Sequence, residues 1–121
     1  MTNQTLQDLL PLPVAQLHIL LALASGDKHG YAIMSEVEVL TERAVTMGPG
    51  TLYGTVKKML KAGLIEESDE RPDPELDDQR RRYYRITSKG RQVLDAEINR
   101  MEQLAGAARM IQAAAKRRPT T

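Results

Sequence analysis

Glycines and lysines mark the segment GPGTLYGTVKKMLKAGLIEE, which runs from Gly48 to Glu67. Glycines ahead of a helix and lysines on it can bind the phosphates of a nucleotide, or they can present a helix to DNA. A nucleotide-binding loop needs a glycine and a lysine followed by Ser or Thr, directly after a buried strand. No lysine of the segment follows a glycine in this way, and the preceding LTERAVTM continues a helix and a turn. The nucleotide-binding interpretation therefore fails on both spacing and context.

A helix over residues 49–62 would separate an apolar face from a basic one. At about 100° per residue, its apolar residues share one side: Leu52, Val56, Met59 and Leu60. The other side has no acid; it carries Thr51, Gly54, Lys57, Lys58 and Lys61. Lysines in this position can bind phosphates, and Thr51 and Tyr53 can reach phosphates or base edges near the helix start. A solvated lysine face explains the same pattern, so this segment alone leaves both interpretations open.

A second basic group lies further along the chain. Residues 79–91 hold six basic residues and no acid, whereas residues 66–78 hold eight acids and one base. In an alternating strand some of the arginines must face solvent, where they are free to bind phosphate. They could instead neutralise the acidic loop, although such surface pairs contribute only about 0–1 kcal/mol. Because the acids would repel phosphate, we expect DNA contacts from Arg80, Arg81 and Arg82 rather than from the loop tip.

Few other residues have catalytic or metal-binding side chains. The chain has no cysteine, which excludes disulfides and thiolate metal sites. His18 lies among apolar residues, where packing in the core or a dimer is expected, and His29 starts a helix, where a local hydrogen bond is expected. No carboxylate pair, Ser-His-Asp set or metal cluster has the spacing that chemistry requires. We therefore expect no enzyme activity, no metal and no cofactor.

The composition limits the fold and the location of the protein. The length of 121 residues suits one domain with an appended element, and a core without Phe or Trp favours helices with at most a small sheet. The net charge of +1 gives no reason to expect nucleic acid, but the charges are segregated along the chain. No apolar run reaches about 18 residues and no signal peptide is visible. A soluble cytoplasmic protein with no membrane partner is expected.

Periodicity and turn residues predict the elements that position these side chains. Helices are expected over residues 13–24, from His29 or Tyr31 to Arg43 and over residues 49–62, where Gly63 serves as the C-cap. Two short strands, one from Leu64 and one over residues 80–87, form a hairpin around the charged loop. Three helices followed by a hairpin predict a mainly α, winged helix-turn-helix fold, whose third helix enters a major groove.

The last element is a long helix from Thr87 to about Lys116, capped by Thr87 or Ser88. Its apolar residues step by three and four, as in a coiled coil: Leu94, Ile98, Met101, Leu104, Ala108 and Ile111. We expect this stripe to form a homodimer, although the helix could also pack onto its own domain. The predicted organisation is a flexible arm (residues 1–11), the winged helix-turn-helix domain (12–86), the dimerisation helix (87–116) and a tail (117–121).

Three motifs together resemble the PadR family of bacterial transcriptional regulators. They are HGYAI (His29 to Ile33), GPGTLYGTVKKMLKAGLIEE (Gly48 to Glu67) and RRRYYRITSKGRQVL (Arg80 to Leu94). They occur in the order and spacing of the family, and the resemblance extends from about Leu12 to Met110. The combination of all three is more specific than any one of them.

The resemblance implies a homodimeric winged helix protein that uses its C-terminal helix for dimerisation. It implies binding to a two-fold symmetric operator in double-stranded promoter DNA, usually as a repressor that a small-molecule effector releases. Tyr31, Thr51, Tyr53 and Lys57 fall where DNA contacts or their supports are expected. The family often has a larger residue at the position of Gly54. Some relatives bind planar drugs through a tryptophan, which this chain lacks, so that binding mode is not transferred.

One other class of function fits the same elements. A winged helix can serve as a protein-interaction module without sequence-specific DNA binding, because a fold does not determine a function. In that case the acidic loop over residues 66–78 would be the contact surface. Sequence-selective DNA binding discriminates the two hypotheses.

Overall fold

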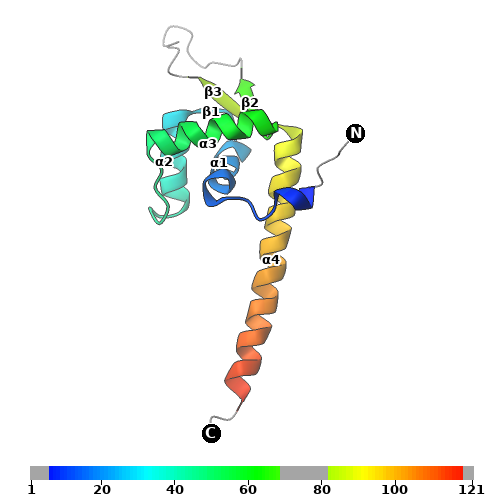
Figure 1. The fold of residues 1–121 in the computed structure, drawn as a ribbon. Coiled ribbons are helices and arrows are strands. Elements are labelled where there is room, and N and C mark those ends of the chain that lie inside the picture. Colours follow the sequence, from blue (N-terminus) through cyan, green and yellow to red (C-terminus); the bar gives the residue numbers. More distant parts are fainter. Residues whose placement is uncertain (1–5, 69–81, 119–121) are drawn as a thin grey trace.

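The computed structural model describes residues 6–68 and 82–118, and it shows a head of helices and strands from which one long helix projects (Figure 1). The elements are η1 (Leu6–Leu9), α1 (Val14–Ala24), β1 (Lys28–His29), α2 (Gly30–Leu40), α3 (Pro49–Ala62), β2 (Ile65–Ser68), β3 (Tyr83–Ile86) and α4 (Ser88–Arg117). This is a winged helix-turn-helix fold with a long C-terminal helix, which confirms the predicted fold class. Within the described ranges, no helix is both long and apolar enough to cross a membrane.

The strands form a three-stranded antiparallel sheet in the order β1-β3-β2. In the β2–β3 pair, Ile65 lies opposite Ile86 and Ser68 lies opposite Tyr83. The sequence predicted only this two-stranded hairpin. The third strand, β1, is two residues long and places Lys28 opposite Tyr84, and so short a strand has no periodicity that could reveal it.

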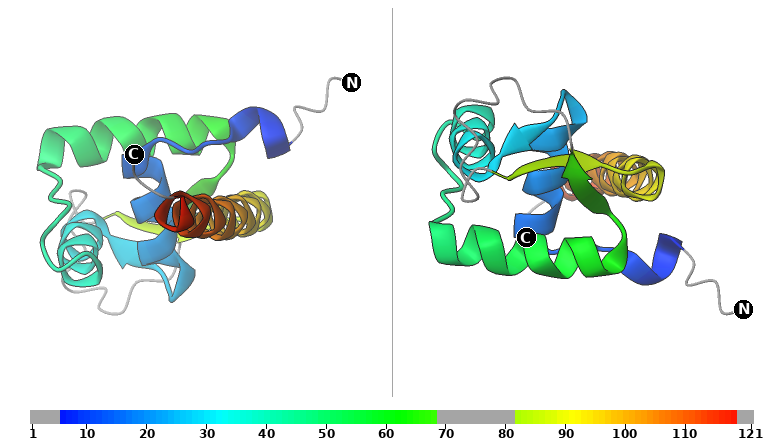
Figure 2. Two further views of the ribbon diagram at one scale, coloured as in Figure 1. Left: turned by 90° about the horizontal axis from the view of Figure 1, so that it is seen from below. Right: turned by 90° about the horizontal axis from the view of Figure 1, so that it is seen from above.

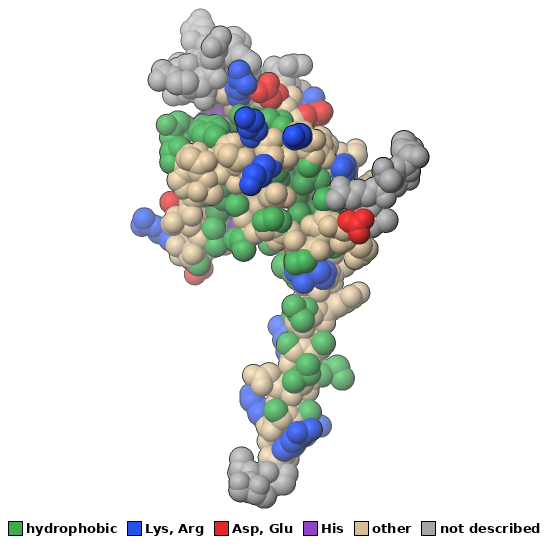
Figure 3. All heavy atoms as spheres, viewed as in Figure 1, with side chains coloured by type: hydrophobic (Ala, Val, Ile, Leu, Met, Phe, Trp, Pro, Cys, Tyr) green, Lys and Arg blue, Asp and Glu red, His purple; other side chains and the backbone are tan. Residues whose placement is uncertain are grey.

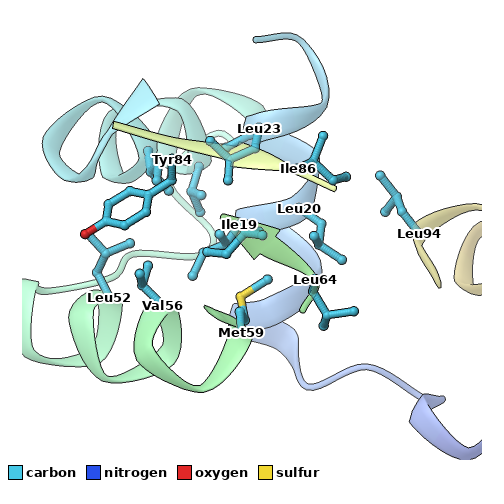
Figure 4. Close-up of a cluster of buried hydrophobic side chains, with 14 of the residues drawn as sticks. Ile19, Leu20, Leu23, Leu52, Val56, Met59, Leu64, Tyr84, Ile86 and Leu94 are labelled. Atoms are coloured by element: carbon cyan, nitrogen blue, oxygen red, sulfur yellow. The ribbon is translucent and has the colours of Figure 1, made fainter. Parts of the chain in front are cut away.

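Helix α1 lies at the centre of the head, where it contacts α2, α3, α4 and β3 (Figure 2). Its side chains Ile19, Leu20 and Leu23 are fully or almost fully buried. Apolar side chains from α3, the sheet and the start of α4 converge on them (Figure 4). Burying an aliphatic side chain of this size contributes about 1.5–3 kcal/mol. The core therefore fixes α3 and the sheet relative to each other through α1.

The apolar face predicted for α3 forms part of this core. Leu52, Val56 and Met59 are buried, and Leu60 is half-buried against the core. Helix α2 departs from the expected helix at its end: Ile33 and Val37 are buried, whereas Leu40, its last residue, is exposed. Helix α2 ends at Leu40, three residues earlier than predicted, and the turn that follows holds Glu42 and Arg43 at positive φ.

The segment before α1 differs from the predicted flexible arm. Residues 6–9 form η1, whose Leu6 and Leu9 pack against the core. Close by, the backbone N–H of Leu12 donates a 2.8 Å hydrogen bond to the carboxylate of Glu97 on α4. These contacts fix the described part of the segment to α4.

The first turn of α4 is anchored to the end of α3. The Thr87 hydroxyl accepts a hydrogen bond from the Gly90 N–H at 3.0 Å, which makes Thr87 the N-cap, and it donates one to the Gly63 carbonyl at 2.6 Å. A side chain at Gly90 would collide with the carbonyl oxygen of Leu64. Glycine at this position therefore lets α4 start directly against the sheet.

Candidate nucleic-acid interface

The outer face of α3 presents a basic surface on the head. Lys57, Lys58 and Lys61 are exposed, and basic side chains gather over α3 on the face shown in Figure 3. Helix α3 contains no acid, and none of the described acids forms an ion pair with these lysines. The three ammonium groups are therefore available for an anionic partner.

Both ends of α3 are held by specific backbone features. Gly48 is the N-cap and Pro49 occupies the first turn, where its missing N–H is not needed. At the other end, Gly63 adopts the left-handed conformation with φ 77°, which confirms the predicted C-cap. The Lys89 ammonium donates a 2.8 Å hydrogen bond to the carbonyl of Ala62. The basic face is thus presented on a helix that is fixed at both ends.

Tyr53 connects α3 to the start of α2. A Cβ atom placed on Gly30 would collide with the Tyr53 hydroxyl and would lie 3.0 Å from a methyl group of Leu52. The tyrosine ring therefore lies over the glycine, and 37% of the Tyr53 residue remains exposed. Tyr31, one residue further along α2, is 64% exposed. This geometry makes Tyr53 a support between the two helices as well as a candidate contact, whereas Tyr31 is free to contact a partner.

The two histidines make local interactions. The Nδ1 atom of His29 accepts a hydrogen bond from the Ala32 N–H at 3.3 Å and so caps α2, as expected from the sequence. Its ring meets that of Tyr83 edge-to-face, with centroids 5.4 Å apart. The Nδ1 atom of His18 lies 2.7 Å from the Val14 carbonyl oxygen, to which it can donate. Among the described residues, no group of His, Asp or Glu side chains is arranged to hold a metal ion.

The described arginines of the wing, which is the hairpin of β2 and β3, pair with acids of the neighbouring strand. Arg82 lies 3.1 Å from Glu67, and Arg85 lies 2.9 Å from Glu66. The alternative drawn from the sequence expected such pairing with the acids between Asp73 and Asp78, which lie outside the described residues. The Arg82 side chain is 59% exposed, and an exposed pair of this kind contributes little, so Arg82 can exchange Glu67 for a phosphate.

Two of the predicted wing contacts, Arg80 and Arg81, lie outside the described residues, as does most of the acidic segment over residues 66–78. Within β3 the predicted alternation is present: Tyr84 and Ile86 are buried, and Tyr83 and Arg85 are half-buried. Tyr84 points toward Leu52 of α3 (Figure 4). Burial, followed by the nearby Glu67 charge, raises the pKa of Tyr84, so its neutral ring couples the wing to α3.

Gly54 lies on the basic face with no intramolecular reason to be glycine. It is exposed, its φ is helical, and a Cβ atom there would meet nothing within 4 Å. Glycine in an exposed helix interior costs roughly 0.5–1 kcal/mol relative to alanine. Folding alone would therefore favour alanine at this position.

The stripe predicted for dimerisation divides into two parts along α4. Leu94 is buried in the core of the head, and Ile98 packs against that core. For these two residues the structure therefore follows the alternative prediction, in which the helix packs onto its own domain. Met101 is half-buried, and the later members are exposed: Leu104, Ala108 and Ile111. Leu104 is 59% and Ile111 is 68% exposed. The part of α4 beyond the head thus presents apolar side chains to solvent.

The buried carboxylate of Glu97 is a feature that the sequence analysis missed. Glu97 is 1% exposed, accepts the Leu12 N–H and pairs with the Arg100 guanidinium. The hydrogen bond from Arg100 holds the pKa of Glu97 below its ordinary value, with help from Leu12 and against the opposing effect of burial. A glutamate at a core position of an amphipathic helix was the available sequence signal. Its role is to fix α4 to the segment before α1.

The three-helix head, its sheet and the anchored basic helix define a winged helix-turn-helix protein. Residues 19–96 match the sequence profile described as "Transcriptional regulator PadR-like family". The chain belongs to this family of transcriptional regulators, which confirms the resemblance seen in the sequence and the expectation that it is not an enzyme.

Two curated relatives show the extent of the similarity. The chain is 34% identical over 90 residues to the transcriptional regulator Rv3488 of Mycobacterium tuberculosis (strain ATCC 25618 / H37Rv), covering 74% of this chain and 78% of that protein. It is also 34% identical over 92 residues to an uncharacterised 37.1 kDa protein in transposon Tn4556 of Streptomyces fradiae. This second match covers 76% of the chain but spans only 24% of the length of the transposon protein.

Solved structures share the fold. A transcriptional regulator from Clostridium thermocellum superimposes with a TM-score of 0.64 at 26% identity, over 80% of this chain and 90% of that one. Bacillus subtilis PadR, crystallised in complex with operator DNA, superimposes with a TM-score of 0.60 at 24% identity. This match covers 73% of this chain and 47% of that one. At such identity the likeness to PadR shows a common fold.

Proposed function

We propose that this chain is a sequence-specific DNA-binding transcriptional regulator that acts in the cytoplasm on double-stranded promoter DNA. The observation that carries the proposal is the exposed, acid-free face of α3, with Lys57, Lys58 and Lys61 on a helix anchored at both ends. Membership of a family of transcriptional regulators supports it, as does the fold shared with a protein crystallised on its operator.

The geometry supports a particular way of docking. Helix α3 enters the major groove, where lysines bind phosphates and Thr51, in its first turn, reaches toward a base edge or a phosphate. The wing lies against the flanking backbone, where Arg82 leaves Glu67 for a phosphate and Arg80 and Arg81 add further charge. Tyr31, which is 64% exposed, contacts the backbone at the start of α2.

We further propose that the regulator is a homodimer and a repressor. The exposed Leu104, Ala108 and Ile111 of α4 supply the contact between two copies, and a two-fold dimer matches a two-fold operator. Repression, and release of the protein by a small-molecule effector, are the regulatory behaviour that the family resemblance implies. Transcription from the bound promoter with and without the protein tests the sign of the regulation.

Replacing two lysines of α3 tests the proposed interface. The double substitution Lys57→Ala and Lys58→Ala should weaken binding to specific and unrelated duplexes alike, because phosphate contacts carry no sequence information. Removing one lysine–phosphate contact should reduce the magnitude of the log–log salt slope by about 0.9. Fluorescence anisotropy with a duplex enriched from genomic DNA, titrated at several salt concentrations, measures both effects.

The matched control removes two charges elsewhere. Lys116→Ala with Arg117→Ala lowers the net charge by the same amount at the far end of α4 and should leave affinity near that of the unchanged chain. An α3 variant that binds as tightly as this control, with an unchanged salt slope, would show that α3 does not carry the interface.

A further inference from the structure

Gly54 is the residue of the basic face that the proposed function leaves unexplained. Other glycines have reasons inside the chain: Gly30 and Gly90 have neighbours that a side chain would strike, and Gly63 has a positive φ. Gly54 has a helical φ, is exposed, and has nothing within 4 Å of an added Cβ atom. A requirement for glycine at this position must therefore come from outside the chain.

The position of Gly54 on α3 indicates what approaches it. At about 100° per residue, Lys57, Lys58 and Lys61 all lie within roughly 60° of Gly54 around the helix axis. The glycine is thus near the angular centre of the basic face, about one turn before Lys57 and Lys58 and two turns before Lys61. A partner that binds these ammonium groups is anionic, and it meets the bare backbone of α3 at Gly54.

An exposed glycine with no neighbouring atoms does not by itself indicate a binding role. Gly106 of α4 is also exposed and also has nothing within 4 Å of an added Cβ atom. It differs from Gly54 in its surroundings, because the positions three, four and seven residues further on hold Arg109, Met110 and Ala113 in place of three lysines. Gly50 shares this exposure but lies in the first turn of α3, next to the Gly48 N-cap. A position in the interior of α3 on its basic face, without an intramolecular reason for glycine, distinguishes Gly54 from both.

We propose that Gly54 is a specificity-determining position, at which the backbone of α3 comes into direct contact with base edges in the major groove. The inference rests on the proposed DNA-binding function. Glycine allows this approach because it has no side chain to hold the helix away from a ligand. A methyl group there moves the helix outward, and base contacts are short-ranged and directional. The lysines have long, flexible side chains and still reach phosphates from the displaced position.

The test compares Gly54→Ala with the unchanged chain in two measurements. The thermal midpoint should rise by about 3 °C, because alanine is the better helix former at an exposed position. Affinity for a duplex enriched from genomic DNA should fall by about tenfold or more, because one good base contact contributes about that much discrimination. Affinity for a scrambled duplex of the same composition should stay within about twofold, because phosphate contacts supply non-specific binding.

Gly106→Ala is the matched control. It adds the same methyl group to an exposed helical glycine outside the basic face, so it should raise the thermal midpoint similarly and leave both affinities unchanged. The readout that separates a specificity role from a structural one is the ratio of specific to non-specific affinity, which a general change in stability does not alter.

The outcomes distinguish this proposal from the proposed function. If the Gly54→Ala variant is more stable and binds the enriched duplex as tightly as the unchanged chain does, the specificity role is overturned and DNA binding stays intact. An equal decrease in affinity for both duplexes would overturn it as well, since the methyl group would then disturb phosphate contacts. If the unchanged chain binds no duplex selectively, the proposed function fails and this inference fails with it.

Discussion

At the scale of single residues, glycines that look alike in the sequence have different physical reasons. Gly30 is covered by Tyr53, Gly90 lies against the backbone of Leu64, and Gly54 faces open space. The sequence analysis assigned Gly63 to a C-cap correctly, because position after an apolar helix is a local signal. Close approach between Gly30 and Tyr53 joins residues far apart in the chain, so no local pattern could predict it.

The packing of Tyr53 over Gly30 can be tested by substitution. Gly30→Ala should lower the free energy of unfolding by about 1–3 kcal/mol, because the new methyl group displaces the Tyr53 ring and crowds Leu52. In a chain that already carries Tyr53→Ala, the same substitution should cost less by at least about 0.5 kcal/mol. Urea unfolding of the four chains of this cycle measures the coupling. Equal costs in the two backgrounds would show that Tyr53 does not occupy the space above Gly30.

At the scale of elements, the sequence predicted α3 and α4 closely. The boundaries of α3 match, and α4 runs from Ser88 to Arg117 with Thr87 as its cap, one of the two caps expected. Strong periodicity and clear end signals explain this success. Strand β1 and helix η1 are two and four residues long, which is too short for periodicity, and they form because the sheet and α4 supply their partners.

Glu97 fixes α4 to the segment before α1, and it makes that attachment sensitive to pH. Its folded-state pKa is lowered below the ordinary value of 4.5, chiefly by the hydrogen bond from Arg100. A carboxyl whose pKa is lowered by folding stabilises the native state at pH values above its pKa in the unfolded state. This contribution disappears as the pH falls below that value and through the folded-state pKa.

Glu97→Gln tests this attachment. The amide can still accept the Leu12 N–H but cannot pair with the Arg100 charge, so the variant should be less stable than the unchanged chain at about pH 7. The difference in free energy of unfolding between the two chains should become smaller as the pH falls below about 4.5, because the carboxyl of the unchanged chain then becomes protonated. Urea unfolding across this range checks it. Glu102→Gln, at an exposed position of the same helix, is the control, and a difference of constant size at all pH values would contradict the role of Glu97.

At the scale of the whole molecule, α4 projects away from the head (Figure 1), and apolar side chains on its projecting part are exposed to solvent. Leu104, Met110 and Ile111 are each more than half exposed. The sequence predicted the stripe but could not say where the head ends along it, because residues packed on the own core and residues facing a partner follow the same spacing. The buried Val93, Leu94 and Glu97 show that the head includes the first three turns of α4. Truncation before these residues would damage the head itself.

Acidic substitutions beyond the head therefore test dimerisation more cleanly than truncation. Leu104→Glu with Ile111→Glu places two charges in the proposed contact and should convert a dimer to a monomer in sedimentation velocity experiments. The thermal midpoint of this variant should be measured alongside, because separation from the partner also lowers apparent stability.

The matched control for this substitution lies on another side of α4. Gln103→Glu with Ala113→Glu adds the same charge at exposed positions that helical geometry directs away from the stripe. This control should sediment as the unchanged chain does. A Leu104/Ile111 variant that sediments as a dimer, or an unchanged chain that sediments as a monomer, would contradict the dimer.

The central claim is that two copies of this chain read a specific DNA sequence through α3. Selection of bound fragments from genomic DNA by the full chain tests it most directly. We predict enrichment of an inverted repeat whose half-sites are separated by about one helical turn, roughly 10–10.5 base pairs between centres, or a multiple of it. Recovery of fragments without any common sequence, at a salt concentration where the protein still binds DNA, would contradict the claim.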